Sequence, residues 1–223
     1  DYLIKPVNPN QVLLSIKKNL HKQEIYDEVT TTDYRKEFGS ITMSFTDART
    51  IEDWINIYKK LTNWDIQLSD LRDESVKEIL EYQKNEANSE FAKFIKREYK
   101  EWFKPKTLSK PIMSHTLFRN SVIPVVDKNE KSVFLLIDNF RYDQWRAISS
   151  LLRGHYDVAQ DDFYCAILPT ATQYARNAIF AGLMPLAIDK LMPQQWLNDN
   201  EEGGKNQFEE QFFKRLLSQT GKT

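Results

Sequence analysis

The sequence predicts an α/β protein with an all-α part. A strand and a helix, the remnant of a first domain, lead into a three-helix bundle and then into the beginning of a doubly wound parallel sheet. Apolar residues recur at helical spacing, without a convincing strand, from about residue 21 to residue 103. After residue 132, short apolar runs alternate with amphipathic segments in β-α-β-α order, which is typical of a parallel sheet. We expect domain boundaries that give 1–20, 21–106 and 107–223.

The composition is that of a globular protein, with 41% hydrophobic and 28% charged residues and a net charge of -1. This balance does not indicate non-specific binding to nucleic acid or to an anionic membrane. The single cysteine, Cys165, cannot form an internal disulfide, which favours a reducing compartment. No run approaches about 18 apolar residues, so we expect no membrane insertion.

The first region combines a short strand with a helix. Residues 2–4 are apolar, and Pro6 ends them because proline fixes φ and lacks an amide donor. Asn8 and Pro9 are typical of a helix start. The apolar residues that follow share one helical face: Val12, Leu13, Ile16 and Leu20. Because the chain begins at Asp1, close to a strand, we expect it to be an internal piece of a longer protein.

The second region predicts three helices joined by short loops. The first covers about 22–38 and ends near Gly39. Thr50 caps the second, and Asp53 completes a capping box three residues later. The third runs over about 73–103, and its charged residues form a solvated face.

The third region begins after a linker rich in proline and lysine at 104–111. Its predicted elements are, in order, a short helix at 115–120, a buried strand at 133–137, a helix at 142–152, a strand at 164–168, a helix at 172–182, a polar loop at 198–206 and a helix from Phe208.

Polar side chains follow the two predicted strands of this region. Asp138 comes directly after the first, and Thr170 and Thr172 follow the second. Ligands gather beyond the carboxyl ends of parallel strands, so we expect these side chains to converge. A carboxylate suits a divalent cation, and a threonine hydroxyl becomes a nucleophile once it is activated. Arg176, one turn on, offers a guanidinium to a phosphate. The pattern therefore predicts a metal-dependent phosphoryl-transfer site.

The same spacing has a simpler explanation. Asp138 and Thr172 each precede a predicted helix, and both residue types are frequent helix caps. The spacing alone leaves both interpretations open.

Two segments resemble a known family. PTATQYARNAIFAGLMP (169–185) resembles the nucleophile segment of the alkaline phosphatase superfamily, and LLIDNFRYDQW (135–145) resembles the first metal-ligand strand of its PglZ branch. The resemblance implies that Asp138 is a zinc ligand and that Thr172 is both nucleophile and ligand, with Thr170 as the alternative nucleophile. It also implies that Arg176 and Asn177 bind the phosphate.

The N-terminal segment carries a second resemblance. DYLIKPVNPNQVLLSIKK is similar to the last strand and helix of a response-regulator receiver domain. Lys5 would contact the phosphoryl group, and Pro6 would be the usual cis proline. An ordinary turn at the end of a strand is the alternative.

The order of these parts resembles the PorX-type response regulators of type IX secretion systems. This resemblance implies a cytoplasmic regulator that a histidine kinase phosphorylates and that forms a homodimer. It implies a zinc-dependent phosphodiesterase output domain that acts on cyclic or short oligonucleotides. The implied partners are a sigma factor and a component of the secretion motor.

The pattern of the family is incomplete in this sequence. The three histidines, His21, His115 and His155, lie at positions typical of surface or packing residues. A catalytic zinc takes about three protein ligands, so we expect the remaining ligands to lie beyond Thr223. The acidic pocket of the receiver would lie before Asp1. We therefore expect the chain by itself to be inactive and to bind zinc weakly.

A non-catalytic function is the alternative. The bundle and the PglZ-like part would then form a dimerising signalling or adaptor module that binds a sigma factor or a secretion-motor component. Its surface would include aromatic residues of the predicted helices, although such side chains more often fill a core than an interface: Trp54, Trp64, Phe94 and Trp102.

Overall fold

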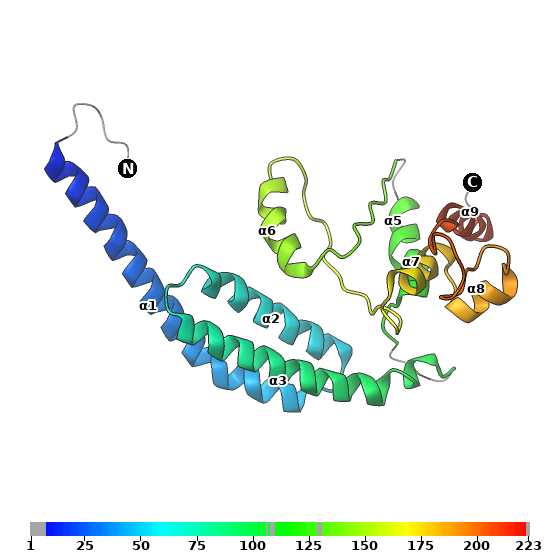
Figure 1. The fold of residues 1–223 in the computed structure, drawn as a ribbon, viewed down its shortest axis with the longest axis horizontal. Coiled ribbons are helices and arrows are strands. Elements are labelled where there is room, and N and C mark those ends of the chain that lie inside the picture. The colour runs from blue at the N-terminus through cyan, green and yellow to red at the C-terminus, as the bar shows by residue number, and fades with distance from the viewer. Residues whose placement is uncertain (1–7, 106, 108–109, 129–130, 222–223) are drawn as a thin grey trace. The chain divides into compact units, whose positions relative to one another are not determined.

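The computed structural model describes residues 8–105, 107, 110–128 and 131–221. Within these residues the chain forms two compact units. Helices α1, α2 and α3 belong to the first unit, and helices α4, α5, α7, α8 and α9 to the second (Figure 1). Helix α6 (Tyr142–Leu152) is divided between them, because Tyr142–Ile148 group with the first unit. None of the helices in this described part combines the length and the apolar character that a bilayer span requires.

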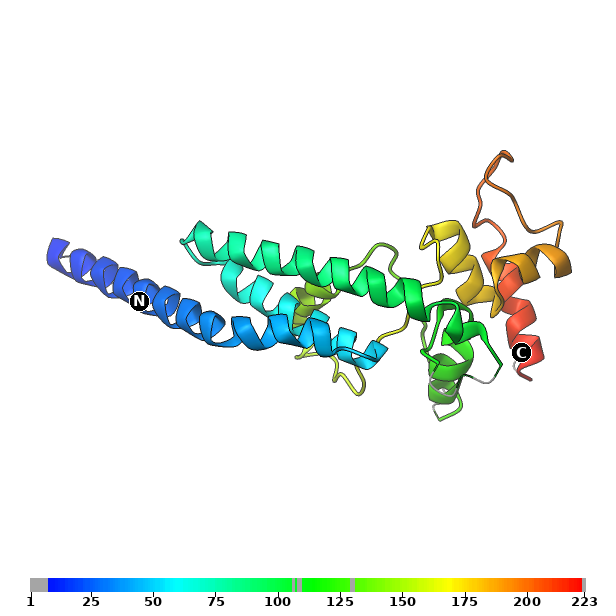
Figure 2. The same ribbon diagram turned by 90° about the horizontal axis from the view of Figure 1, so that it is seen from below.

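The first unit is a bundle of three helices that lie side by side (Figures 1 and 2). They are α1 (Pro9–Asp47), α2 (Ile51–Ser69) and α3 (Glu74–Glu98), followed by a 3₁₀ turn at Glu101–Phe103. The sequence predicted a helix before residue 20 and a second one from residue 22, whereas α1 is continuous through both. The predicted strand at 2–4 and Lys5 lie outside the described residues.

Side chains mark where the helices begin. The Asn8 side chain accepts a hydrogen bond from the backbone N–H of Asn10 at 2.9 Å. At α2 the predicted capping box is confirmed, because the N–H of Asp53 donates to Thr50 Oγ1 and the N–H of Thr50 donates to Asp53 Oδ2. The backbone N–H groups of Arg49 and Thr50 lower the pKa of Asp53.

Aromatic side chains fill the bundle core. The ring of Trp54 lies 5.3 Å from that of Phe91 and 6.1 Å from that of Phe94, which are ordinary distances for tilted aromatic pairs. The four aromatic residues that the sequence offered as an adaptor surface are all buried, with exposed fractions of 8% or less: Trp54, Trp64, Phe94 and Trp102. These side chains stabilise the bundle from inside.

A buried polar network joins α1 to α3. Gln83 is fully buried, and its Oε1 accepts a hydrogen bond from Tyr34 Oη at 3.1 Å. Its Nε2 donates to the carbonyl of Phe38 at 3.0 Å and to Thr42 Oγ1 at 2.8 Å. Burial raises the pKa of Tyr34 to about 12, so the phenol stays a donor. Because buried polar groups are costly without partners, this network fixes how α3 lies along α1.

Replacing Gln83 tests this role. We expect Gln83→Ala to lower the free energy of unfolding by about 2–4 kcal/mol, because it leaves Tyr34 Oη without its acceptor and opens a cavity. Urea denaturation followed by circular dichroism measures the change. The exposed Gln67 of α2 provides the control, and Gln67→Ala should leave the free energy of unfolding nearly unchanged. Equal effects of the two substitutions would contradict the network's role.

The second unit surrounds one central helix, α7 (Thr172–Ala181). Before it come α4 (Ser114–Leu117), a π turn at Phe118–Val122 and α5 (Ile123–Val126). After it come α8 (Pro185–Leu191), which the sequence analysis missed, and α9 (Glu209–Gln219). Helix α7 packs against α4, α8 and α9.

Two hydrophobic clusters meet on α7. Ala181 belongs to one, together with Ile188, Trp196 and Phe212. Ile179 belongs to the other, together with Phe118 and Leu216. Since α7 contributes to both clusters and α9 does the same through Phe212 and Leu216, these two helices hold the unit together.

The predicted doubly wound parallel sheet is wrong for the described residues, which contain no strand. The only pairing among them is an isolated parallel bridge between Met113 and Cys165. Residues 133–137 alternate as a strand would, but Val133 is 94% exposed and Leu135 77%, while Leu136 packs on the second cluster. An apolar run becomes a strand only when another segment pairs with it. The described residues supply no such partner, and a local pattern cannot reveal this.

Gly182 ends α7 in the left-handed conformation, with φ of 62°. A Cβ built at this position would lie 2.7 Å from Leu216 Cδ1. The end of α7 and the core position of α9 therefore depend on the absence of a side chain.

Alanine substitutions at two glycines should have opposite effects. Gly182→Ala should destabilise the chain by about 1–3 kcal/mol, because it combines an unfavourable φ with a steric overlap. Gly39 lies inside α1 with nothing within 4 Å of a built Cβ. Gly39→Ala should therefore stabilise by about 0.5–1 kcal/mol. Thermal and urea denaturation of both variants measure this, and a neutral Gly182→Ala would refute the proposed constraint.

Candidate active site

The predicted nucleophile region lies at the start of α7. Thr172 is the first residue of the helix, and Ala171 occupies the N-cap position without a side-chain cap. Thr172 therefore does not cap the helix, which was the simpler alternative. Thr170 and Thr172 are both exposed. Thr172 is thus at the N-terminus of a ten-residue helix, where the first backbone N–H groups favour an anion.

Asp138 lies on an irregular segment rather than at the end of a strand. Its Oδ1 accepts a hydrogen bond from the N–H of Asn139 at 3.0 Å, and Asn139 adopts a positive φ of 54°. Helix α6 begins only at Tyr142, so Asp138 is not in its N-cap position. The predicted convergence at a sheet edge does not explain where this carboxylate lies.

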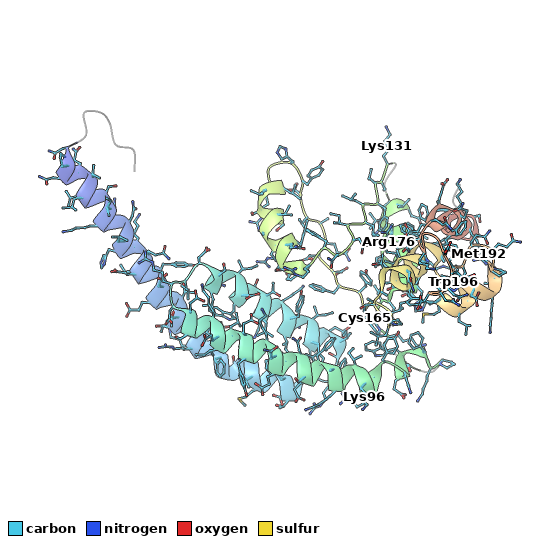
Figure 3. The ribbon with its side chains drawn as sticks, in the orientation of Figure 1. Lys96, Lys131, Cys165, Arg176, Met192 and Trp196 are labelled. Atoms are coloured by element: carbon cyan, nitrogen blue, oxygen red, sulfur yellow. The ribbon has the colours of Figure 1, made fainter. Side chains whose placement is uncertain are left out.

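An ion pair brings Asp138 to α7. Arg176 Nη1 lies 3.4 Å from Asp138 Oδ2. Arg176 follows Thr172 by one helical turn. The ion pair therefore brings Asp138 and Arg176 together about one turn from Thr172. Figure 3 labels Arg176 on α7.

Arg176 has a second carboxylate partner that the sequence analysis missed. Its Nη2 lies 2.6 Å from Oε2 of Glu209, the first residue of α9. Burial lowers the pKa of Arg176, but the hydrogen bonds and charges of Glu209 and Asp138 outweigh burial and raise it. Two adjacent glutamates, Glu209 and Glu210, open α9, and only one faces α7. Glu210 instead pairs with Lys214 on the same helix at 2.5 Å.

Asn177 holds a neighbouring loop. It is 2% exposed, and its Nδ2 donates to the carbonyl of Lys205 at 3.0 Å. Its Oδ1 accepts from Asn206 Nδ2 at 3.0 Å, and the same Nδ2 lies 3.4 Å from the carbonyl of Thr172. Both ends of the Asn177 amide are thus bonded to the loop, although the resemblance implied that it binds phosphate.

The polar loop between α8 and α9 lies along the N-terminal half of α7. Tyr174 Oη donates to the carboxylate of Asp199 at 2.9 Å, and Gln173 also bonds to Asp199. Within the loop, Lys205 Nζ donates to the carbonyls of Asn198 and Glu201. The loop and the start of α9 together fix the polar face of α7.

Tyr164 is a further side chain near Asp138. Burial and the charge of Asp138 both raise the pKa of Tyr164. The phenol therefore stays protonated at neutral pH next to the carboxylate.

The donors at this site are too few for zinc. Among residues 8–105, 107, 110–128 and 131–221, no three His, Cys, Asp or Glu side chains gather where they could hold a metal. A catalytic zinc takes about three protein ligands, so Asp138 and Thr172 do not form such a site by themselves. The cation beside Asp138 is the Arg176 guanidinium. Of the histidines, His21 and His155 are exposed and His115 is half-buried.

Comparison with known families identifies both parts of the chain. Residues 24–103 match the model of the PorX response regulator linker domain. Residues 117–222 match the BREX system PglZ alkaline phosphatase-like domain. These two matches, in this order, agree with the resemblance to the PorX-type response regulators. No curated protein matches it.

These two domains fit a response regulator with a phosphoesterase-like output. The linker domain suggests a kinase partner, and the alkaline phosphatase-like domain suggests dependence on a metal. Its match contains Asp138, Thr170, Thr172 and Arg176.

The burial of His115 predicts a pH dependence of stability. Burial lowers the pKa of His115 below its usual value of 6.5. As the pH falls below about 6.5, the unfolded chain binds this proton before the folded chain does, so folding becomes less favourable. We expect His115→Gln to remove part of the stability loss between pH 7.5 and pH 5.5 in urea denaturation. The control is His155→Gln, which changes an exposed histidine, and an equal change in its pH slope would contradict the prediction.

Proposed function

We propose that the chain is the linker and output part of a response regulator that hydrolyses phosphodiesters at the start of α7, with Thr172 as the nucleophile and Thr170 as the alternative. The contact between Arg176 and Asp138 carries this proposal, because it brings a guanidinium and a carboxylate together one turn from Thr172. The match to the alkaline phosphatase-like domain supports the reaction class.

The chemistry assigns a task to each group. The oxygen of Thr172 attacks phosphorus and loses its proton, the ester oxygen leaves and takes up a proton, and water then releases phosphate monoester from the threonine. Arg176 and the first backbone N–H groups of α7 hold the non-bridging oxygens as their charge increases.

Zinc belongs to this proposal only in part. Asp138 and Thr172 would supply two of its ligands, and the others would come from outside the described residues. Such an ion polarises phosphoryl oxygens and makes a hydroxyl more acidic when it is bound.

The biological setting is proposed from the same resemblance. A histidine kinase would phosphorylate the receiver, in which Lys5 contacts the phosphoryl group, and the regulator would form a homodimer in the cytoplasm. The substrate would be a cyclic or short oligonucleotide, and the output would control type IX secretion through a sigma factor and a component of the secretion motor. The linker match supports the first of these steps, since it suggests a kinase partner.

A non-catalytic adaptor function is the second candidate. The four aromatic residues first considered for it are buried. An apolar face of α1 is open instead, with Leu13 53%, Ile16 50% and Leu20 46% exposed. This face precedes the linker match at 24–103 and favours a docking function for the N-terminal part of α1, which is compatible with hydrolysis at α7.

Hydrolysis of bis(4-nitrophenyl) phosphate by the full-length protein tests the enzymatic proposal. We expect Thr172→Ala to reduce kcat at least about 100-fold, because it removes the attacking oxygen, and Thr170→Ala to reduce it much less. If Thr170 is the nucleophile, the order of these effects reverses.

Two comparisons complete the experiment. Thr32→Ala changes an exposed threonine of α1 and should keep the wild-type rate. Activity that persists in the variant carrying both Thr170→Ala and Thr172→Ala would defeat the enzymatic proposal and favour the adaptor.

A further inference from the structure

We infer that Glu209 is a positioning residue: it anchors one edge of the Arg176 guanidinium so that the other edge, which now contacts Asp138, is presented to a phosphate beside Thr172. This inference rests on the proposed function and adds to it a residue that neither the motif nor the resemblance indicated. Arg176 is the group that would contact the substrate, and Glu209 acts through it.

The two ion pairs of Arg176 are unequal. The contact to Glu209 is 2.6 Å long, and the Glu209 side chain is 18% exposed. The contact to Asp138 is 3.4 Å long, and the Asp138 side chain is 48% exposed. An exposed, long ion pair contributes little, whereas a short and largely buried one is costly to break. Glu209 is therefore the firm partner and Asp138 the exchangeable one.

The backbone positions of Glu209 and Asp138 also make Glu209 the more firmly held partner. Glu209 begins α9, whose Phe212 and Leu216 are fully buried. These residues lie three and seven positions after Glu209, so all three share one helical face. Asp138, by contrast, belongs to an irregular segment. Core packing thus fixes the Glu209 carboxylate in place.

The ion pair between Arg176 and Glu209 has a buried polar atom on each side. Arg176 Nε and Glu209 Oε1 are buried, and neither has a hydrogen-bond partner within the described part of the chain. Moving either side chain away would leave the other with more unpaired polar atoms at the same place. The pair therefore holds the guanidinium in one orientation.

A phosphate fits the remaining edge. Guanidinium groups bind carboxylates and phosphates through the same planar arrangement of N–H donors. A phosphoryl group can replace Asp138 at Nη1 while Nη2 stays on Glu209.

Phosphate binding to the chain tests the inference, with inorganic phosphate as the probe. The Nε–H signal of Arg176 in ¹⁵N-edited NMR spectra, assigned by its loss in Arg176→Lys, reports on the guanidinium directly. We expect phosphate to shift this signal in the wild-type chain. Glu209→Gln should weaken phosphate binding at least about fivefold and move the signal even without phosphate. Circular dichroism checks that each variant is folded.

Charge alone makes the opposite prediction for Glu209→Gln, so this variant distinguishes the two explanations. Removing either carboxylate removes negative charge near Arg176, so simple repulsion would tighten phosphate binding in both variants. Positioning predicts opposite signs: Asp138→Asn tightens binding, and Glu209→Gln weakens it. The matched control is Glu210→Gln, which changes the adjacent exposed glutamate and should keep the wild-type dissociation constant.

Three outcomes would overturn the inference. They are a wild-type Arg176 signal that phosphate does not move, a Glu209→Gln chain that binds phosphate as tightly as the wild type, and equal effects of Glu209→Gln and Glu210→Gln. Should Glu209→Gln fail to fold, Glu209→Asp keeps the charge but shortens the side chain, and it should weaken binding in the same direction. A Glu209→Asp chain that binds phosphate as tightly as the wild type would equally refute the positioning role of Glu209.

The test is separable from that of the proposed function. Hydrolysis that does not depend on Thr170 or Thr172 would refute the proposed enzymatic function. It would not affect the phosphate-binding measurements at Arg176. If phosphate does not shift the Arg176 signal but hydrolysis depends on Thr172, only the positioning role of Glu209 is refuted.

Discussion

The burial of α7 between two hydrophobic clusters is the constraint on which the candidate site depends. Ile179 enters one cluster and Ala181 the other, so the core holds α7 from two sides, and polar residues nearer its start meet the polar loop and the irregular segment that carries Asp138. Because Phe212 and Leu216 of α9 enter the same clusters, α9 cannot move away from α7 without opening both. Apolar packing thus determines where the charged groups can meet.

Ion pairs then determine which charged groups meet at the start of α7. Arg176 lies between two carboxylates, one of them largely buried and one exposed. A guanidinium stays charged at any physiological pH, so it satisfies Asp138 without a bound ion. The same arrangement explains how a site with few metal donors can hold its carboxylate in place. Asn177 and the loop it binds add the hydrogen bonds that fix the remaining polar face of α7.

The helical elements were predictable because their signals are local. The capping box at Thr50 was predicted and found, since it depends on a few neighbouring residues. The parallel sheet was not found among the described residues, because strand pairing depends on a partner far away in the sequence. Strand pairing among the described residues is limited to the isolated bridge between Met113 and Cys165. Helix α8 was missed since its seven residues make only about two turns, too few to show a helical period.

For the site, the sequence by itself determined which residue types cluster around α7. Asp138, Thr172 and Arg176 stand out through motif and spacing, and the family models match the segments that contain them. Only the tertiary structure decided their partners. It placed Asp138 on Arg176, committed Asn177 to the loop and selected Glu209 over Glu210. The physical reason is that a residue's chemistry is a property of its own side chain, whereas contacts follow from how the helices pack, and two adjacent glutamates differ only in which face of α9 they occupy.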